Sequence, residues 1–279
     1  MPSLKRFGIL LSAAAIVYTA GCATGGGTRQ STAAALDKIL AGAHRSEANR
    51  ARDVYRHPKQ TLLFFGIRPG MTVVEVWPGG GWYTEIIAPL VREKGKYYAA
   101  TIAPDPSSEY ITNQLKSYRE MLAARPDLYG KVEVTVLSPD GADLAPPGSA
   151  DMVVTFRNLH NWMSDGWAPQ AIAAMFKALK PGGVLGVVEH RGRADMPQDP
   201  QAKSGYVNED YAVKLIEDAG FKLVAKSEIN ANPQDTKDYQ QGVWTLPPTY
   251  RLGDQDKAKY ARIGESDRFT LKFVRPTEK

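Results

Sequence analysis

Residues 71–91 constrain the fold of this chain more than any other segment, and they read MTVVEVWPGGGWYTEIIAPLV. The pattern predicts a buried β-strand over residues 72–77, a glycine-rich turn over residues 78–81 and then a helix. Glycines at the carboxyl end of a strand let a ligand approach bare backbone, and the next helix offers unpaired N–H groups. The segment therefore favours a nucleotide-cofactor site, although similar turns also serve as plain connections.

The first 21 residues have the pattern of a secretory signal. Lys5 and Arg6 precede an apolar run over residues 7–20, which is shorter than the roughly 20 residues that a membrane-spanning helix needs. The sequence TAGC that ends at Cys22 resembles a bacterial lipobox, with Thr19 where Leu is usual. We expect an exported, periplasmic protein that is lipid-anchored to a bacterial membrane through Cys22; an ordinary cleaved signal is the alternative.

Beyond the signal, the sequence predicts one domain. Residues 22–32 hold Cys22 and a flexible, small-residue tether, and residues 33–279 are long enough for one well-buried α/β domain. Cys22 is the only cysteine, which excludes an internal disulfide and a thiolate metal cluster. The formal net charge of +5 falls to +3 without Lys5 and Arg6, which is too small to indicate a nucleic-acid partner.

Strands and helices alternate along most of this domain. Further strands are predicted over residues 96–102, 132–137, 151–156, 184–188 and 221–229, and helices over residues 33–52, 108–124, 169–179 and 209–219. Such alternation predicts a doubly wound, mostly parallel sheet with helices on both faces, and ligands bind beyond the carboxyl ends of its strands. Residues 230–268 have no helix or strand of ordinary length, so we expect an insertion that serves as a lid or as surface elaboration.

The order of these motifs resembles the class I, Rossmann-like methyltransferases that depend on S-adenosylmethionine (SAM). VVEVWPGGG is similar to the first motif of that family, DMVVTFRNLHNW to its fourth-strand segment, and LKPGGVLGVVEH and AGF match in kind and spacing. The resemblance covers residues 50–229 and a final strand over residues 269–274. It is closest to exported "predicted methyltransferase" lipoproteins whose first motif also reads WPGGGWYTE. It implies seven strands in the order 3-2-1-4-5-7-6, with the last antiparallel, and SAM as cofactor.

The resemblance also implies which residues bind the cofactor. They are Glu75, Trp77, Gly79, Gly80, Gly81, Thr101, Asp140 and Asn158. Two of them depart from the family pattern. Trp77 stands at the usual first glycine of the turn, and Thr101 replaces the carboxylate that binds the ribose hydroxyls, a role that Asp105 could take over. These changes either reshape the pocket for SAM or close it.

Two histidines are expected at the same edge of the sheet. His160 follows the fourth predicted strand and Glu189-His190-Arg191 follows the fifth, and adjacent strands lie about 4.8 Å apart. Methyl transfer needs a positioned nucleophile and, where that nucleophile carries a proton, a base. We expect His190 to be the base and His160 to be the second candidate, with a structural histidine as the alternative for each. No ligand spacing supports a metal site of these residues with Asp165, so none is predicted.

Two function classes follow from the sequence. The first is a SAM-dependent methyltransferase with an unusual pocket that acts on a small molecule. Because SAM is made in the cytosol, an exported protein would meet little of it, so the second class is an exported, non-catalytic binding or accessory protein on the same scaffold. Arg52 and Arg56, upstream of the first strand, indicate either a solvated charged face or, turned inward, bidentate partners for an anionic ligand group.

Overall fold

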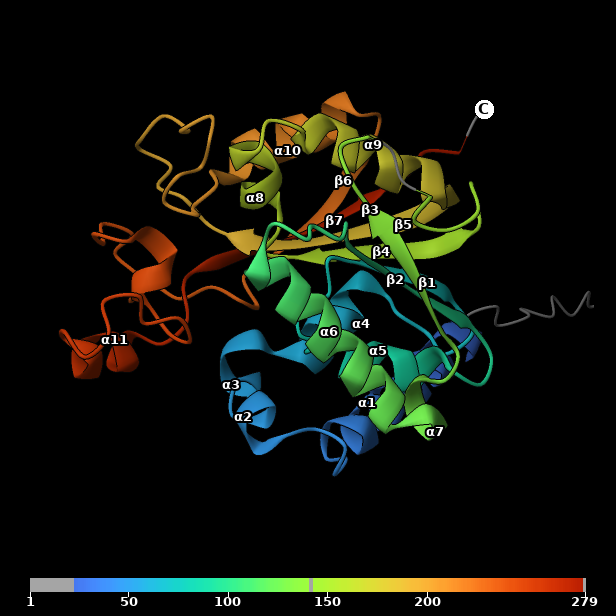
Figure 1. Ribbon diagram of the computed structural model, residues 1–279. Helices are drawn as coiled ribbons and strands as arrows, with labels where there is room; N and C mark the ends of the chain where they lie inside the picture. Colours follow the sequence, from blue (N-terminus) through green and yellow to red (C-terminus); the bar gives the residue numbers. More distant parts are fainter. Residues whose placement is uncertain (1–22, 141–142, 278–279) are drawn as a thin grey trace, which may run out of the picture.

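A seven-stranded sheet forms the centre of the computed structural model, which describes residues 23–140 and 143–277 (Figure 1). Its strands are β1 (Thr72–Val76), β2 (Lys96–Ile102), β3 (Val132–Leu137), β4 (Ala150–Phe156), β5 (Leu179–His190), β6 (Lys222–Ser227) and β7 (Arg268–Val274). They lie in the order β3-β2-β1-β4-β5-β7-β6. The first five strands in this order, β3, β2, β1, β4 and β5, are parallel. Strand β7 runs antiparallel to both β5 and β6. The predicted fold class and strand order are confirmed.

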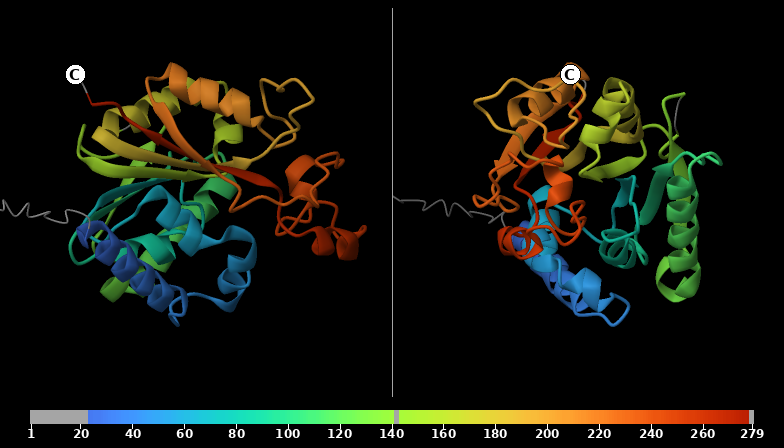
Figure 2. Two further views of the ribbon diagram at one scale, coloured as in Figure 1. Left: turned by 180° about the vertical axis from the view of Figure 1, so that it is seen from behind. Right: turned by 60° about the vertical axis from the view of Figure 1, so that its left-hand side comes forward.

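Helices cover both faces of the sheet (Figure 2). On one face lie α8 (Leu159–Ser164), α9 (Ala168–Ala178) and α10 (Glu209–Asp218). On the other lie α1 (Ala23–Leu40), α4 (Pro58–Phe65), α5 (Thr84–Val91), α6 (Glu109–Ala124) and α7 (Pro126–Tyr129). Two short helices, α2 (Glu47–Arg50) and α3 (Asp53–Arg56), connect α1 to α4. None of the helices in these ranges is both long and apolar enough to cross a membrane.

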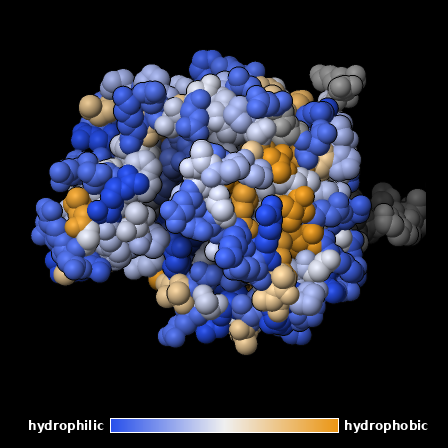
Figure 3. Space-filling model, viewed as in Figure 1, coloured by the Kyte–Doolittle hydropathy of each residue, from blue (hydrophilic) through white to orange (hydrophobic). Residues whose placement is uncertain are grey.

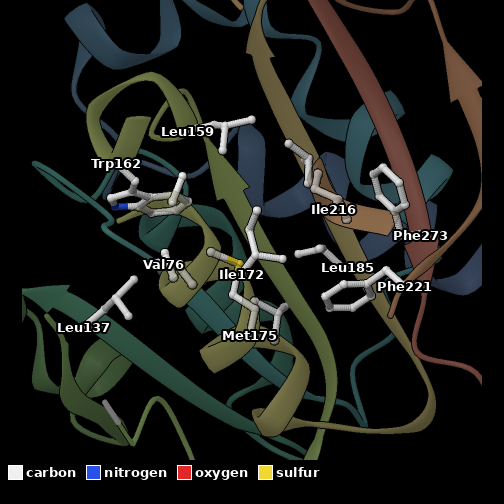
Figure 4. Close-up of a cluster of buried hydrophobic side chains, with 14 of the residues drawn as sticks. Val76, Leu137, Leu159, Trp162, Ile172, Met175, Leu185, Ile216, Phe221 and Phe273 are labelled. Carbon is white, nitrogen blue, oxygen red and sulfur yellow. The ribbon is translucent and has the colours of Figure 1, made fainter. Parts of the chain in front are cut away.

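Two apolar clusters hold the three layers together. Because side chains alternate along a strand, Val73 of β1 joins the cluster under α4 and α5, whereas Val74 and Val76 join the cluster under α8, α9 and α10. In the cluster under α8, α9 and α10, Ile172 of α9 and Leu185 of β5 lie among aromatic and aliphatic side chains (Figure 4). Strands buried on both faces explain why the central strands read as nearly continuous apolar runs.

The N-terminal region differs from the sequence prediction. Residues 23–32, expected as a tether, form the first part of α1, and the helix expected over residues 33–52 ends at Leu40. Leu36 is fully buried beside α4 and α5, so tertiary packing holds this segment helical despite its glycines. A separate helix, α2, begins where the Ser46 side chain accepts a hydrogen bond from the backbone of Asn49. The predicted signal sequence and Cys22 lie outside the described residues.

The segment between β6 and β7 forms a wall at the carboxyl edge of the sheet. It contains the 3₁₀ helix η1 (Gly242–Thr245) and α11 (Lys257–Ile263), and it projects beyond the strand ends on the left of Figure 1. Buried polar contacts fix it in place: Asn232 donates to the carbonyl groups of Ile263 and Glu265, and Asp235 accepts from the hydroxyl of Tyr206. The surface is hollowed where this segment meets the rest of the domain (Figure 3).

Candidate ligand-binding site

A cavity of about 410 Å³ lies at the carboxyl edge of the sheet, in the hollow beside the insertion (Figure 3). Its walls come from α2 and α3, the turn after β1, the beginning of α8, the end of β5 and the insertion. Seven of the ten residues predicted for the site line it: Glu75, Trp77, Gly79, Gly80, Asn158, His160 and His190. The fold therefore brings the two predicted histidines and the glycine turn into one cavity.

A second cavity, of about 270 Å³, adjoins the first at the ends of β1 and β2. Trp77, Gly79 and Asn158 line both cavities, and Thr101 lines only the second. The hydroxyl of Thr101 donates to the carbonyl oxygen of Thr135 at 3.0 Å, so it presents a neutral group to the cavity. The two cavities together form a ligand site that extends across three neighbouring strands.

Asp140, Asp105 and Gly81 line neither cavity. Asp140 is exposed on the turn after β3, and the Asp105 carboxylate accepts hydrogen bonds from the backbone and hydroxyl of Ser107 instead. Gly81 has φ +83°, and an added Cβ would lie 2.6 Å from the sulfur of Met121 in α6. Gly81 therefore packs closely against α6 and Asp140 faces solvent, and contact of either residue with the cofactor stays a prediction.

The other two glycines of the turn present bare backbone to the cavity. An added Cβ at Gly79 or Gly80 would meet none of the described atoms within 4 Å. Asn158 fixes the turn from the neighbouring strand, because its side-chain amide donates to the carbonyl oxygen of Val76 at 2.9 Å. A ligand can therefore approach the peptide groups of Gly79 and Gly80 directly.

Trp77 forms a wall of the site and does not cover the turn. Its backbone is left-handed, with φ +50°, and its indole packs against Trp162 and Trp167 at centroid distances of 5.6 and 5.7 Å. The indole N–H donates to the carbonyl oxygen of Leu137 at 3.4 Å. This position of Trp77 fits the alternative of a reshaped pocket.

Glu75 lies at the base of the first cavity and is almost fully buried. The hydroxyl groups of Thr84 and Tyr97 both donate to its carboxylate, the former at 2.9 Å. Burial nevertheless outweighs these hydrogen bonds and raises the pKa of Glu75 to about 7. The carboxyl group is therefore only partly ionised near neutral pH.

Glu189 orients the ring of His160. The carboxylate is fully buried at the end of β5, and it accepts hydrogen bonds from the backbone N–H groups of His190 and His160 at 2.7 and 3.3 Å. Its Oε1 also lies 3.0 Å from Nδ1 of His160. A carboxylate requires a donor, so the proton resides on Nδ1, and Nε2 of His160 remains as the proton acceptor.

His190 lies beside this pair, with its ring centroid 5.3 Å from that of His160 and its Nδ1 2.5 Å from the hydroxyl of Ser266. Burial lowers the pKa of His190 well below its usual value, and the positive charge of Arg157 acts in the same direction. His160, Glu189 and His190 also offer metal-ligand atoms within 4.8 Å of one another. The Glu189 carboxylate accepts from three N–H groups, one of them on the His160 ring.

Arginine side chains dominate the charge of the cavity. Glu265 of the insertion pairs with Arg52, Arg56 and Arg268 at 2.8, 3.1 and 2.9 Å. Burial alone would raise the pKa of Glu265, but these guanidinium groups outweigh it and lower the pKa to about 2. Arg52 and Arg56 thus turn inward, and both line the cavity.

Arg157 is a site residue that the sequence analysis missed. It follows β4, lines the cavity and has a left-handed backbone with φ +62°. Within residues 23–140 and 143–277, no carboxylate lies within ion-pair distance of its guanidinium. The position of Arg157 directly after an apolar strand could have identified it as a site residue. No local sequence pattern identified Glu265.

The fold is shared with solved structures of low sequence identity. No protein-family model and no curated protein matches the chain. A SAM-dependent methyltransferase from Aquifex aeolicus is 18% identical, with a TM-score of 0.54 over 87% of this chain and 98% of that chain. The [4+2]-cyclase SpnF is 14% identical, with a TM-score of 0.59 over 85% and 86%.

A third similar structure contains the cofactor that the sequence resemblance implied. It is phosphoethanolamine N-methyltransferase 2 from Haemonchus contortus in complex with S-adenosyl-L-methionine, 15% identical, with a TM-score of 0.54 over 80% of this chain and 53% of that chain. At such identities the likeness establishes the methyltransferase fold alone. Since SpnF is a cyclase, function has to be argued from the site.

The pKa of Glu75 predicts how stability depends on pH. The folded protein keeps a proton on Glu75 up to about pH 7, whereas the unfolded chain releases it near pH 4.5. The contribution of this group is complete below pH 4.5 and is lost as the pH rises through 7. Glu75→Gln removes this dependence, so its free energy of unfolding should gain on the order of 3 kcal/mol relative to wild type across that range.

Urea unfolding at a series of pH values measures this difference. Glu133→Gln, at an exposed position on β3, serves as the control and should give a curve parallel to that of wild type. Parallel curves for Glu75→Gln and wild type would show that Glu75 is ionised throughout the range.

Proposed function

We propose that this chain is a SAM-dependent methyltransferase that acts on a small molecule. The observation that carries the proposal is the bare backbone of Gly79 and Gly80, which opens into two adjoining cavities beyond the carboxyl ends of β1, β2 and β4. This is the edge at which doubly wound sheets bind nucleotide ligands. Similarity of the fold to SAM-dependent methyltransferases supports the same reading.

The residues around the two cavities fit SAM. The volumes of about 410 and 270 Å³ lie in the range of small-molecule sites. Arg52 and Arg56 offer guanidinium groups to the cofactor carboxylate, and Gly79 and Gly80 leave room beside the turn. Thr101 gives the ribose a neutral hydrogen bond in place of a charged one, which costs on the order of 1–2 kcal/mol, or about tenfold in affinity. When bound, SAM supplies an electrophilic methyl group.

We assign the role of general base to His160. Glu189 holds its Nδ1–H, so Nε2 can accept the proton that an O–H or N–H nucleophile loses. The lowered pKa of His190 makes that ring a poorer base, which reverses the order expected from the sequence. Trp244 of the insertion lies 6.0 Å from the His160 ring and shields it from bulk water.

The oriented histidine also favours an enzyme over the non-catalytic alternative. A plain binding protein needs no buried carboxylate to fix a histidine tautomer, and burying an ionisable group costs free energy unless it is hydrogen-bonded. Here the fully buried Glu189 carboxylate accepts hydrogen bonds from the His160 ring and from two backbone N–H groups at the rim of the cavity. This arrangement is typical of a group that moves a proton.

Titration calorimetry of the domain with SAM and with S-adenosylhomocysteine tests the cofactor. Wild type should bind both, and Gly80→Val should abolish binding while the protein stays folded, because the added side chain occupies open cavity space. Gly70→Val is the matched control, since Gly70 also has open space but lies before β1 and lines neither cavity. Absence of binding by wild type at millimolar concentrations would refute the methyltransferase proposal.

Long-range ¹H–¹⁵N NMR spectra at neutral pH test the histidine pair. We expect His160 to carry its proton on Nδ1 in wild type and to lose this preference in Glu189→Gln, because an amide can donate as well as accept. His44, whose Nε2 contacts the carbonyl oxygen of Glu85, should give the same signals in both proteins. A protonated Nε2 on His160 in wild type would contradict the assigned role.

We further propose that the chain is exported and anchored through Cys22, on the strength of the charged start, the short apolar run and the TAGC sequence. Mass spectrometry of the membrane fraction should show a mature chain that begins at lipidated Cys22. Cys22→Ser should remove the lipid and release the protein from the membrane fraction. An intact Met1 in soluble cytosolic protein would contradict export and would remove the difficulty of SAM supply.

A further inference from the structure

We infer that Arg157 anchors an anionic small molecule in the first cavity, and that this anion is the acceptor of the methyl group. The claim that the anion accepts the methyl group rests on the proposed function, whereas the anion site itself rests on the charges of the cavity. The proposed acceptor is an acid with a carboxylate or phosphate group.

The cavity carries an excess of positive charge. Three arginines line it, Arg52, Arg56 and Arg157, and Arg268 is buried directly behind them. Against these four guanidinium groups stands the ionised carboxylate of Glu265. Glu75, which lines the same cavity, is partly ionised near neutral pH, so the balance of these six groups lies between +2 and +3. An aqueous site with this balance attracts anions and repels cations.

Among the residues that the structure describes, none places a carboxylate at ion-pair distance from Arg157. The other three guanidinium groups each lie within 3.1 Å of a Glu265 oxygen. Arg157 is only half-buried, so water reaches it from the cavity, and its fork of N–H donors is available for a bidentate contact. Its left-handed backbone is held by a hydrogen bond to the carbonyl oxygen of Val188 at 2.7 Å, and strain of this kind is usual at ligand sites.

The cofactor does not satisfy this charge. SAM carries one carboxylate against an ammonium and a sulfonium group, so its own net charge is +1. Its carboxylate neutralises one guanidinium, yet the site with SAM bound is more positive than the site without it. An acceptor that brings a negative charge restores the balance, and its attraction to the sulfonium also draws it toward the methyl group.

The insertion supplies the apolar part of the acceptor site. Trp244, Pro247 and Pro248 line the cavity together with the glycine turn. The Trp244 ring is fixed by the His160 ring at 6.0 Å and by the guanidinium of Arg251 at 4.5 Å. A flat acid can lie against this wall with its anionic group toward Arg157 and its nucleophile toward Nε2 of His160. The geometry therefore favours a planar acid over a flexible one.

Binding of benzoate, phenyl phosphate and neutral benzamide tests the inference, with and without S-adenosylhomocysteine at saturation. Wild type should bind one of the two anions at least about tenfold more tightly than benzamide, and added salt should weaken that binding. The preference for benzoate or for phenyl phosphate identifies the anionic group. Arg157→Gln should lose the anion preference, and its affinity for S-adenosylhomocysteine should match that of wild type.

Two control variants and three outcomes separate the possibilities. Arg157→Lys should keep part of the preference, and Arg193→Gln, which alters an exposed arginine paired with Asp195, should keep all of it. Equal affinity for benzoate and benzamide would overturn the inference. Competition between benzoate and S-adenosylhomocysteine, with weaker cofactor binding by Arg157→Gln, would also overturn it, because Arg157 would then serve the cofactor. Anion binding that depends on Arg157 in a protein that binds no S-adenosylhomocysteine would support the anion site and refute the methyl transfer.

Discussion

The site depends on one carboxylate, that of Glu265. Its two oxygens pair with Arg52 and Arg56 from the segment before β1 and with Arg268 at the beginning of β7, more than 200 residues along the chain from the first two. Arg268 also donates to the carbonyl oxygen of Tyr55. These contacts fasten the N-terminal helices to the insertion and so close the cavity on one side. Removal of this carboxylate would leave three buried or half-buried cations without a partner, which is strongly destabilising.

Burial acts on the two carboxyl groups of the cavity in opposite ways because their neighbours differ. Glu75 faces hydroxyl groups, which stabilise its charge too weakly to offset desolvation, so its pKa rises to about 7. Glu265 faces guanidinium groups, which overcome the same desolvation and lower its pKa to about 2. Near neutral pH one carboxyl group is thereby only partly ionised and the other fully ionised. The cavity retains a positive charge in either state of Glu75, because four guanidinium groups outnumber the two carboxyl groups.

Local pattern and the family resemblance predicted the sheet and much of the lining of the cavities, but not the charged residues Arg157 and Glu265. Apolar runs, the glycine turn and the β/α alternation identified the strands, and the resemblance to a known family supplied their order, which the structure confirms. Glu265 was missed because two of its arginine partners, Arg52 and Arg56, lie more than 200 residues away along the chain. Arg157 was missed because local pattern does not show which charged groups the fold places around it. Gly81 was assigned to the ligand because a turn pattern cannot show that Met121 of α6 occupies the space beside it. The beginning of α1 was misplaced for a similar reason, since the packing of Leu36 outweighs the low helix propensity of the glycines before it.

The departure at Trp77 shows which part of the glycine motif the geometry requires. A non-glycine residue with a left-handed backbone is strained, but here Asn158 holds the adjacent carbonyl groups and two tryptophans receive the indole. The strain is thus offset by packing that a glycine would not provide. Gly79 and Gly80 have no comparable side-chain pocket, because the space beside them is the ligand cavity. The first glycine of the motif can therefore be replaced by a residue that becomes wall, whereas a side chain at the next two would enter the site itself.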